Sequence, residues 1–207
     1  CVKGTMSGAQ VGAVNMVKSD VTGAQIGIGN MVKGNVSAAE LGALNMVCGD
    51  VTGPQGGVVN MVKGKVAGAE LGVLNMVNGD VTGHQAGVLN MVKGKVSGPQ
   101  LGVVNWDGSD ARRMAGVINL VKGEIDGDQM GVLNIASRGV NYQEGVVNWA
   151  GKVDGFQGGV LNVAKDVVGM QMGVINWTEK LSGLQIGLVN VALKEKLPAM
   201  VLVNAAW

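Results

Sequence analysis

The sequence predicts an all-β fold: a parallel β-solenoid of about fourteen coils of 14–15 residues, with two short strands in each coil. Three observations support it. The pattern Gly-x-Gln-x-Gly-x-x-Asn, clearest within Val81–Lys95, recurs along all 207 residues. A repeat of this length is too short for two packed helices, which excludes the helical repeats of about 33 residues and more. The segments are rich in Val and Gly, which favours short strands and tight turns.

The motif asparagines define the coils. They recur every fifteen residues as far as Asn105 and mostly every fourteen afterwards, and stacked coils lie about 4.8 Å apart. We expect one domain over residues 1–207, with regular coils in 1–105, mostly shorter coils in 106–207 and a degenerate last coil in 195–207. The predicted ladder asparagines are Asn15, Asn30, Asn45, Asn60, Asn75, Asn90, Asn105, Asn119, Asn134, Asn148, Asn162, Asn176, Asn190 and Asn204.

A glutamine column accompanies the asparagines, with Glu40 and Glu70 replacing Gln in two coils. Stacked amides can each donate to one neighbouring coil and accept from the other, which satisfies polar groups that are costly to bury. The glycine two residues after each Gln suits a tight corner or a close approach between sheets. The predicted glutamine ladder is Gln10, Gln25, Gln55, Gln85, Gln100, Gln129, Gln143, Gln157, Gln171 and Gln185.

The order of charges indicates direct stacking. The fifth residue after each Asn is Asp50, Lys65, Asp80 and Lys95 in four successive coils. In parallel register these side chains lie one strand spacing apart, where opposite charges attract. Which strand face points inward stays open, because the residues just before and after each Asn are also apolar.

Large apolar side chains follow the asparagines. Met occupies the position after Asn in the first six coils, as in Met16. This column favours a packing role over soft-metal binding, because no His or Cys partners the methionines. Tryptophans suit packing, lateral association or carbohydrate stacking. The predicted contact face consists of Trp106, Trp149, Trp177 and Trp207.

The repeat pattern is interrupted at Asp107–Ala115, which predicts a bulged loop that resets the period, with Arg112 and Arg113 as candidate binding residues.

Nothing predicts an enzyme, a cofactor or a metal site, since zinc spacing, a nucleophile with a base and a phosphate loop are all missing. The single histidine, His84, replaces the Ala or Pro of sister repeats. The net charge of +1 gives no case for nucleic acid, and no apolar run suits a membrane helix.

The two cysteines are not expected to pair. Cys1 and Cys48 lie about three coils apart, roughly 14 Å, whereas a disulfide needs Cα atoms within about 7 Å. A mature N-terminal Cys is what lipoprotein processing leaves, so Cys1 is a candidate lipid anchor. The alternative is a chain boundary that happens to fall there.

Three segments carry a family resemblance. Leu181–Ala192, with the core Gly-Leu-Gln-Ile-Gly-Leu-Val-Asn, resembles the repeat of bacterial surface-repeat proteins, and the tail 197–207 resembles that family's last unit. Gln55–Val62 is partly similar to the curlin repeat of curli fibre subunits. These resemblances imply export, a cell-surface or fibrous role, and no catalytic residues.

We therefore expect a structural protein of the bacterial cell surface or extracellular space that self-associates into amyloid-like fibres. A head-to-tail contact would pair 1–15 of one molecule with 197–207 of the next. The alternative is a monomeric binding module, either an adhesin that uses the tryptophans or an ice binder that uses Thr22, Thr52 and Thr82.

Overall fold

The computed structural model describes all 207 residues, Cys1–Trp207, and contains strands but no helix. The chain divides into two compact units, Cys1–Ser109 (unit 1) and Asp110–Trp207 (unit 2). Each unit consists of coils stacked through parallel strands, so the predicted β-solenoid is confirmed. The boundary between the units falls inside the predicted interruption.

Unit 1 builds most of its coils from a two-residue strand, a corner and a four-residue strand, as the sequence predicts. In the last two coils the two strands merge into one. The strands are β1 (Gln10–Val11), β2 (Val14–Val17), β3 (Gln25–Ile26), β4 (Gly29–Val32), β5 (Glu40–Leu41), β6 (Leu44–Val47), β7 (Gln55–Gly56), β8 (Val59–Val62), β9 (Glu70–Leu71), β10 (Leu74–Val77), β11 (Gln85–Val92) and β12 (Pro99–Asp107).

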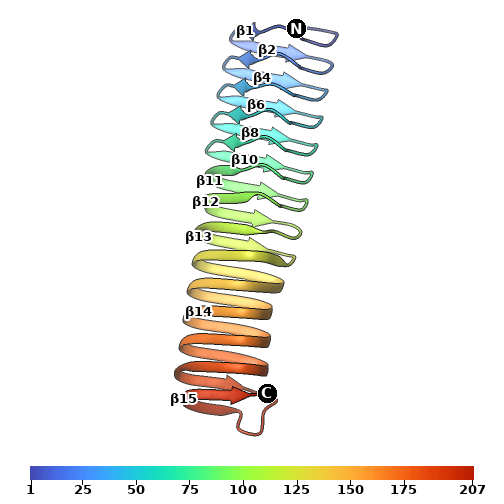
Figure 1. Cartoon of the computed structure of the whole chain (residues 1–207). Coiled ribbons are helices and arrows are strands. Elements are labelled where there is room, and N and C mark those ends of the chain that lie inside the picture. Colours follow the sequence, from blue (N-terminus) through green and yellow to red (C-terminus); the bar gives the residue numbers. More distant parts are fainter. The chain divides into compact units, whose positions relative to one another are not determined.

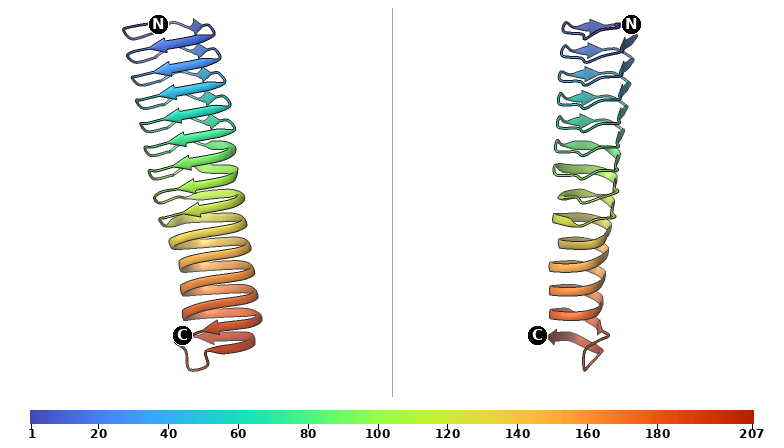
Figure 2. Two further views of the ribbon diagram at one scale, coloured as in Figure 1. Left: turned by 180° about the vertical axis from the view of Figure 1, so that it is seen from behind. Right: turned by 90° about the vertical axis from the view of Figure 1, so that its right-hand side faces the viewer.

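Three parallel ladders hold the coils of unit 1 together. The short strands pair in the order β1-β3-β5-β7-β9-β11 and the longer ones in the order β2-β4-β6-β8-β10-β11. Single bridges such as Val51↔Val66 form the third ladder. Asn60 pairs with Asn75, so the register equals the repeat, and the strands of unit 1 lie one above another in Figures 1 and 2. About eight parallel coils have a spacing of about fifteen residues, and this count differs slightly from the number of coils that the sequence predicts.

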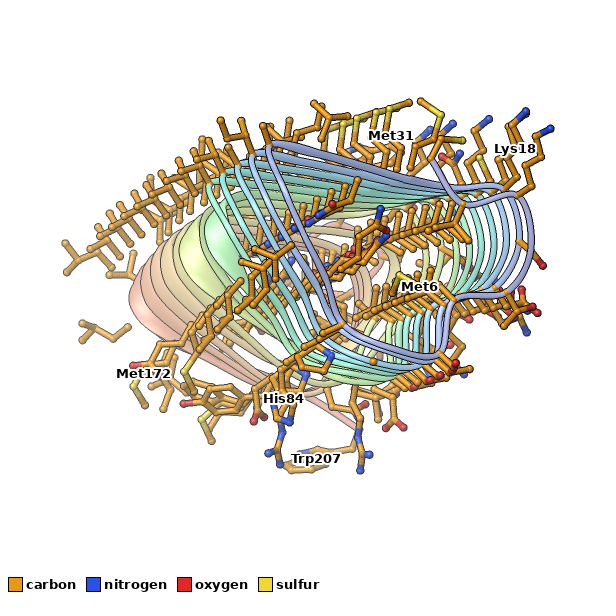
Figure 3. The ribbon with its side chains drawn as sticks, turned by 90° about the horizontal axis from the view of Figure 1, so that it is seen from above. Met6, Lys18, Met31, His84, Met172 and Trp207 are labelled. Carbon is orange, nitrogen blue, oxygen red and sulfur yellow. The ribbon has the colours of Figure 1, made fainter.

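Four residues of each coil face the interior, which settles the open question of the inward face. In one coil they are Gln55, Asn60, Val62 and Val66, none more than 3% exposed. Figure 3 shows Met6, which occupies the position of Val66 in the first coil, pointing into the interior. The residues on either side of Asn60 face outward and are half-buried. The core is thus half amide and half aliphatic.

Unit 2 has shorter coils and fewer breaks in its strands. It comprises β13 (Arg113–Val121), β14 (Ile125–Ala192) and β15 (Ala199–Ala206). β14 continues through successive coils, visible as an unbroken ribbon in Figure 2. Glycines two residues before Gln, such as Gly155 and Gly169, have φ of 150° and 133°. Only glycine adopts this conformation readily, and it closes the shorter coil.

The last strand runs antiparallel to the coil before it, whereas the sequence predicts a parallel coil. β15 pairs antiparallel with the end of β14, so Asn204 lies opposite Gln185 and does not stack on Asn190. In a parallel coil Val201 would take the place of Gly187, where a Cβ would lie 2.2 Å from the carbonyl oxygen of the coil below. Val201 therefore cannot fit a parallel coil, and the chain reverses before β15.

The interruption is also narrower than predicted. Asp107 ends β12 and is fully buried at the position of Val92, so it is not part of a loop. Ala111 bridges Ile125 and Met114 pairs with Gln129, so both continue interior columns. Residues 108–110 form the same kind of turn as residues 93–95, and Arg112 is a bend that leads into β13.

Candidate functional site: amide ladders and an apolar exterior

The asparagine ladder uses every hydrogen-bonding atom of its side chains. Asn60 Nδ2 donates to Asn75 Oδ1 at 2.8 Å and to the backbone oxygen of Leu71 at 3.2 Å, while its Oδ1 accepts from Asn45. Each coil from Asn15 to Asn90 repeats this pair of donations. Unit 2 has the same chain of amides from Asn119 to Asn190. Hydrogen bonds thus join the asparagines from Asn15 to Asn105 and from Asn119 to Asn190, whereas Asn204 lies outside this ladder.

The glutamine ladder runs the opposite way. Gln100 Nε2 donates to Gln85 Oε1 at 2.8 Å, so the donor belongs to the later coil, whereas in the asparagine ladder it belongs to the earlier one. In unit 2 Gln157 donates to Gln143 at 2.8 Å in the same direction. Asn204 Nδ2 donates to Gln185 Oε1 at 3.3 Å, so the reversed strand caps this ladder.

Glycine keeps the coils close enough for the ladders. A Cβ on Gly87 would lie 2.3 Å from Gly72 O and 3.0 Å from Asn75 Nδ2. The coil below therefore occupies the space of a side chain here. The repeated glycine is required by close approach in unit 1, since none of its φ angles is positive.

Three carboxyl groups lie inside unit 1. Glu40 and Glu70 are fully buried and accept from Gln55 Nε2 and Gln85 Nε2, each at 2.5 Å. Burial raises the pKa of both glutamates to about 7, although the glutamine hydrogen bonds lower it. Burial likewise raises the pKa of Asp107 to about 8, opposed by the hydrogen bond from Gln100. Asp107 was missed as an interior residue, although its position two after Asn105 marks it.

The turn column confirms direct stacking of the charges. Lys65 Nζ lies 3.2 Å from Asp80 Oδ2 in the next coil. The side-chain oxygens also accept backbone N–H groups of the following coil, as Asp50 Oδ1 does from Lys65 N at 2.7 Å. Asn35 Oδ1 does the same for Asp50 N at 2.8 Å. Asp and Asn at this position therefore hold the turns together.

Two columns of apolar side chains cover one corner of unit 1. They flank the repeated glycine, and their members are at least 46% exposed, which makes a continuous apolar surface. The prediction of contact residues missed them, although the apolar residues around each corner glycine indicate them. We call them the corner columns: Val11, Ile26, Leu41, Leu71 and Leu101 in one, and Ile28, Val58, Val73, Val88 and Val103 in the other.

A shallow groove follows the methionine column. Met46, Met61 and Met76 line it together with Cys48 and Lys63. The structure thus places a thiol beside methionines that the sequence left without a sulfur or imidazole partner. Figure 3 shows Met31 and Lys18 pointing outward on the same side as this column. Met46 and Met61 are half-buried, consistent with packing between coils.

The predicted tryptophan face is only partly assembled. Trp149 and Trp177 occupy one column of unit 2 with Val163 between them, and Trp149 is 40% exposed. Trp106 belongs to unit 1, and Trp207 is almost fully exposed at the end of the chain. A second aromatic feature is Tyr142 stacked on Phe156, with ring centroids 5.3 Å apart. Unit 2 therefore offers aromatic side chains from two different columns.

The charged residues of the interruption lie at the surface. Arg112 and Arg113 are exposed, and Arg113 lies 3.7 Å from Asp128. Arg138 pairs with Asp110 across two coils of unit 2. These contacts give Arg113 a stacking role between coils.

No cluster of three or more His, Cys, Asp or Glu side chains is placed to hold a metal ion. His84 points outward (Figure 3), and Cys1 and Cys48 are free and exposed. Helices that are long and apolar enough to cross a membrane are absent. No family model, curated protein or solved structure matches the chain. Lipid attachment at Cys1 stays a prediction, which mass spectrometry of the native protein tests.

Proposed function

We propose that this protein is a structural component of a fibre, extracellular or on the bacterial cell surface, and that it works by self-association. The observation that carries the proposal is the pair of corner columns, which repeat an apolar side chain coil after coil. A monomer in water gains nothing from this surface, whereas a second copy with the same repeat can bury it.

Lateral contact follows from the geometry of the corner columns. Val58, Val73, Val88 and Val103 lie in four successive coils, each about half exposed. Their spacing of about 4.8 Å is the same in every copy, so two columns can interdigitate along their whole length. Branched side chains suit such packing, because they lose little conformational freedom on contact.

End-to-end contact uses the strands at the ends of the sheet. β1 pairs with β3 alone and β15 pairs with β14 alone, so each has N–H and C=O groups free to pair with another strand. Val201 and Leu202 on β15 are 71% and 63% exposed, so this edge is also apolar. Pairing of the two edges in successive molecules gives a head-to-tail filament.

Electron microscopy and light scattering of the purified protein test the proposal. We expect filaments that associate side by side. Val73→Lys with Val88→Lys should separate the bundles into single filaments, and removal of residues 195–207 should shorten the filaments. Thr52→Lys with Thr82→Lys adds the same charge at exposed positions outside the corner columns. This control should change neither the bundling of filaments nor their length. A parent protein that stays monomeric at high concentration overturns the proposal.

The second candidate is a monomeric adhesin, favoured by the Tyr142–Phe156 stack. Phe156 and Met172 line a groove with Glu144, which places aromatic and acidic groups where a sugar ring could lie. Binding to a glycan array that is lost in Phe156→Ala supports this function. Ice binding is less favoured, since Thr22 Oγ1 donates to Met6 O at 3.3 Å and is not free to order water.

A further inference from the structure

Two glutamates interrupt the glutamine ladder and leave oxygen atoms without partners. Glu40 pairs in register with Gln25, and Glu70 with Gln55. At both places the Oε1 atoms of the glutamate and of the glutamine are buried and accept no hydrogen bond. An unpaired polar atom in a dry interior costs about 1–3 kcal/mol, so two such pairs in neighbouring levels call for an explanation.

The direction of the ladder identifies what is missing. Each level donates to the coil before it, as Gln25 does to Gln10 and Gln55 does to Glu40. Glu40 and Glu70 should therefore donate to Gln25 and Gln55. An ionised carboxylate only accepts, whereas a protonated carboxyl group has one O–H to donate.

Rotation of the amides cannot replace the missing hydrogens at both levels. Gln55 lies between Glu40 and Glu70, and a terminal amide has its nitrogen on one side and its oxygen on the other. It can donate along the ladder to only one of the two glutamates. If both were ionised, one carboxylate would lie against an amide oxygen away from water.

We propose that Glu40 and Glu70 are protonated in the folded chain and donate to Gln25 Oε1 and Gln55 Oε1, which makes unit 1 a fold that acid stabilises and rising pH weakens. Every level of the glutamine ladder then donates to the coil below and accepts from the coil above.

Asp107 forms a third site of the same kind. Gln100 Nε2 donates to Asp107 Oδ1 at 3.0 Å, while Gln100 Oε1 and Asp107 Oδ2 are both buried and have no partner. A proton on Asp107 Oδ2 donates to Gln100 Oε1. The two side chains then form a ring of two hydrogen bonds, as an amide and a carboxylic acid do.

No charge in the interior opposes this protonation. Glu40, Glu70 and Asp107 are the only buried ionisable side chains of unit 1, and β3, β4, β6, β7, β8, β10, β11 and the rest of β12 contain no charged residue. The charged turn residues, Asp50 among them, are exposed, apart from Asp80, which is half-buried at the surface and paired with Lys65. Burial is accordingly the largest cause of the raised pKa values of about 7 for the glutamates and about 8 for Asp107.

The sign of the pH dependence follows from these values. The folded pKa of each glutamate lies above its ordinary value of 4.5, so its stabilising contribution is complete below that pH. The contribution is lost as pH rises through about 7, and that of Asp107 through about 8. Each glutamate then lowers the folding equilibrium constant by up to about 300-fold.

Denaturant unfolding of the intact chain between about pH 5 and pH 9 tests the proposal. The matched variant is E40Q/E70Q/D107N, which provides at each site an N–H donor in place of the O–H of the protonated carboxyl group. We expect the parent midpoint to fall across this range and the variant midpoint to stay level and exceed the parent's at pH 8. The control D50N removes an exposed charge but keeps the side-chain oxygen that accepts a backbone N–H in the turn, as Asn35 does. Its midpoint should fall with pH like that of the parent.

Infrared spectroscopy gives a readout independent of stability. At about pH 6 the folded parent should show the C=O stretching band of protonated carboxyl groups, and the E40Q/E70Q/D107N variant should lack it. A level parent midpoint, a variant midpoint that falls like the parent's, or absence of the band from the parent overturns the proposal.

Discussion

Asn75 is buried among partners that no apolar side chain can satisfy. It donates to Asn90 Oδ1 and Ala86 O and accepts from Asn60 Nδ2. Asn75→Leu leaves these three groups unpaired, and we expect a loss of about 3 kcal/mol or more in the free energy of unfolding. Asn78→Leu makes the same change at an exposed position of the same coil and should cost less than about 0.5 kcal/mol. Equal denaturation midpoints for the two variants would refute a structural ladder.

Substitutions of Gly87 and Gly29 test whether glycine is needed for the close approach of coils or for backbone flexibility. Gly87→Ala pushes a methyl group against Gly72 O and should cost about 2 kcal/mol, as other overpacked sites do. Gly29 has no atom within 4 Å of the added Cβ, so Gly29→Ala should be neutral or stabilise by up to about 1 kcal/mol. Thermal unfolding of both variants measures the difference, and a similar loss in each contradicts the steric explanation.

The sequence identified the amide ladders but not the whole interior. Asn recurs in every parallel coil, and Gln recurs in all of them except where Glu40, Glu70 and Met114 stand, at positions that stacked amides explain. The valines were ambiguous, because Val59 and Met61 flank Asn60 with equally apolar side chains. Each corner shifts the alternation of inward and outward residues, so a simple period of two cannot identify all four interior columns.

At the level of the turns, two variants of Lys65 separate charge from hydrogen bonding. Lys65→Asp places three carboxylates in adjacent coils and removes the ion pair with Asp80, whereas Lys65→Asn supplies a side-chain oxygen without charge. We expect the Asp variant to be less stable than the Asn variant by up to about 1 kcal/mol at low salt. Denaturation in high salt should shrink the difference, and a difference that salt leaves unchanged contradicts direct stacking of the charges.

The C-terminal element shows where periodicity misleads. Asn204 follows Asn190 at the usual spacing, which places it in the asparagine column by sequence alone. The residue that decides its position is Val201, because a side chain at the corner excludes a parallel coil. The same steric argument could have identified the reversed strand from the sequence, since every parallel coil, from Gly12 to Gly187, has glycine there.

At the scale of the whole molecule, the two units should respond differently to pH. Unit 1 contains three buried carboxyl groups, whereas the buried polar side chains of unit 2 are Asn, Gln and Thr. We expect hydrogen exchange at pH 8, corrected for its intrinsic rate, to show more frequent opening of residues 1–109 than at pH 5, with little change in residues 110–207. Equal responses in both units would contradict this assignment of the titrating groups.

Fold class was predictable because one constraint repeats in every coil, whereas the division into units was not. The period changes near Asn105, and the sequence shows this as a faltering pattern at Asp107–Ala115. How compactly each side folds depends on contacts between coils, which a single repeat does not contain.

The opposed directions of the two amide ladders have an electrostatic consequence. In an α-helix the peptide dipoles add up to about half an elementary charge at each end. In unit 1 the asparagine amides donate toward later coils and the glutamine amides toward earlier ones, so their axial dipoles oppose each other within every coil. The side-chain macrodipole therefore does not grow with the number of coils. A gene that duplicates one fifteen-residue segment lengthens the solenoid without building up charge at its ends.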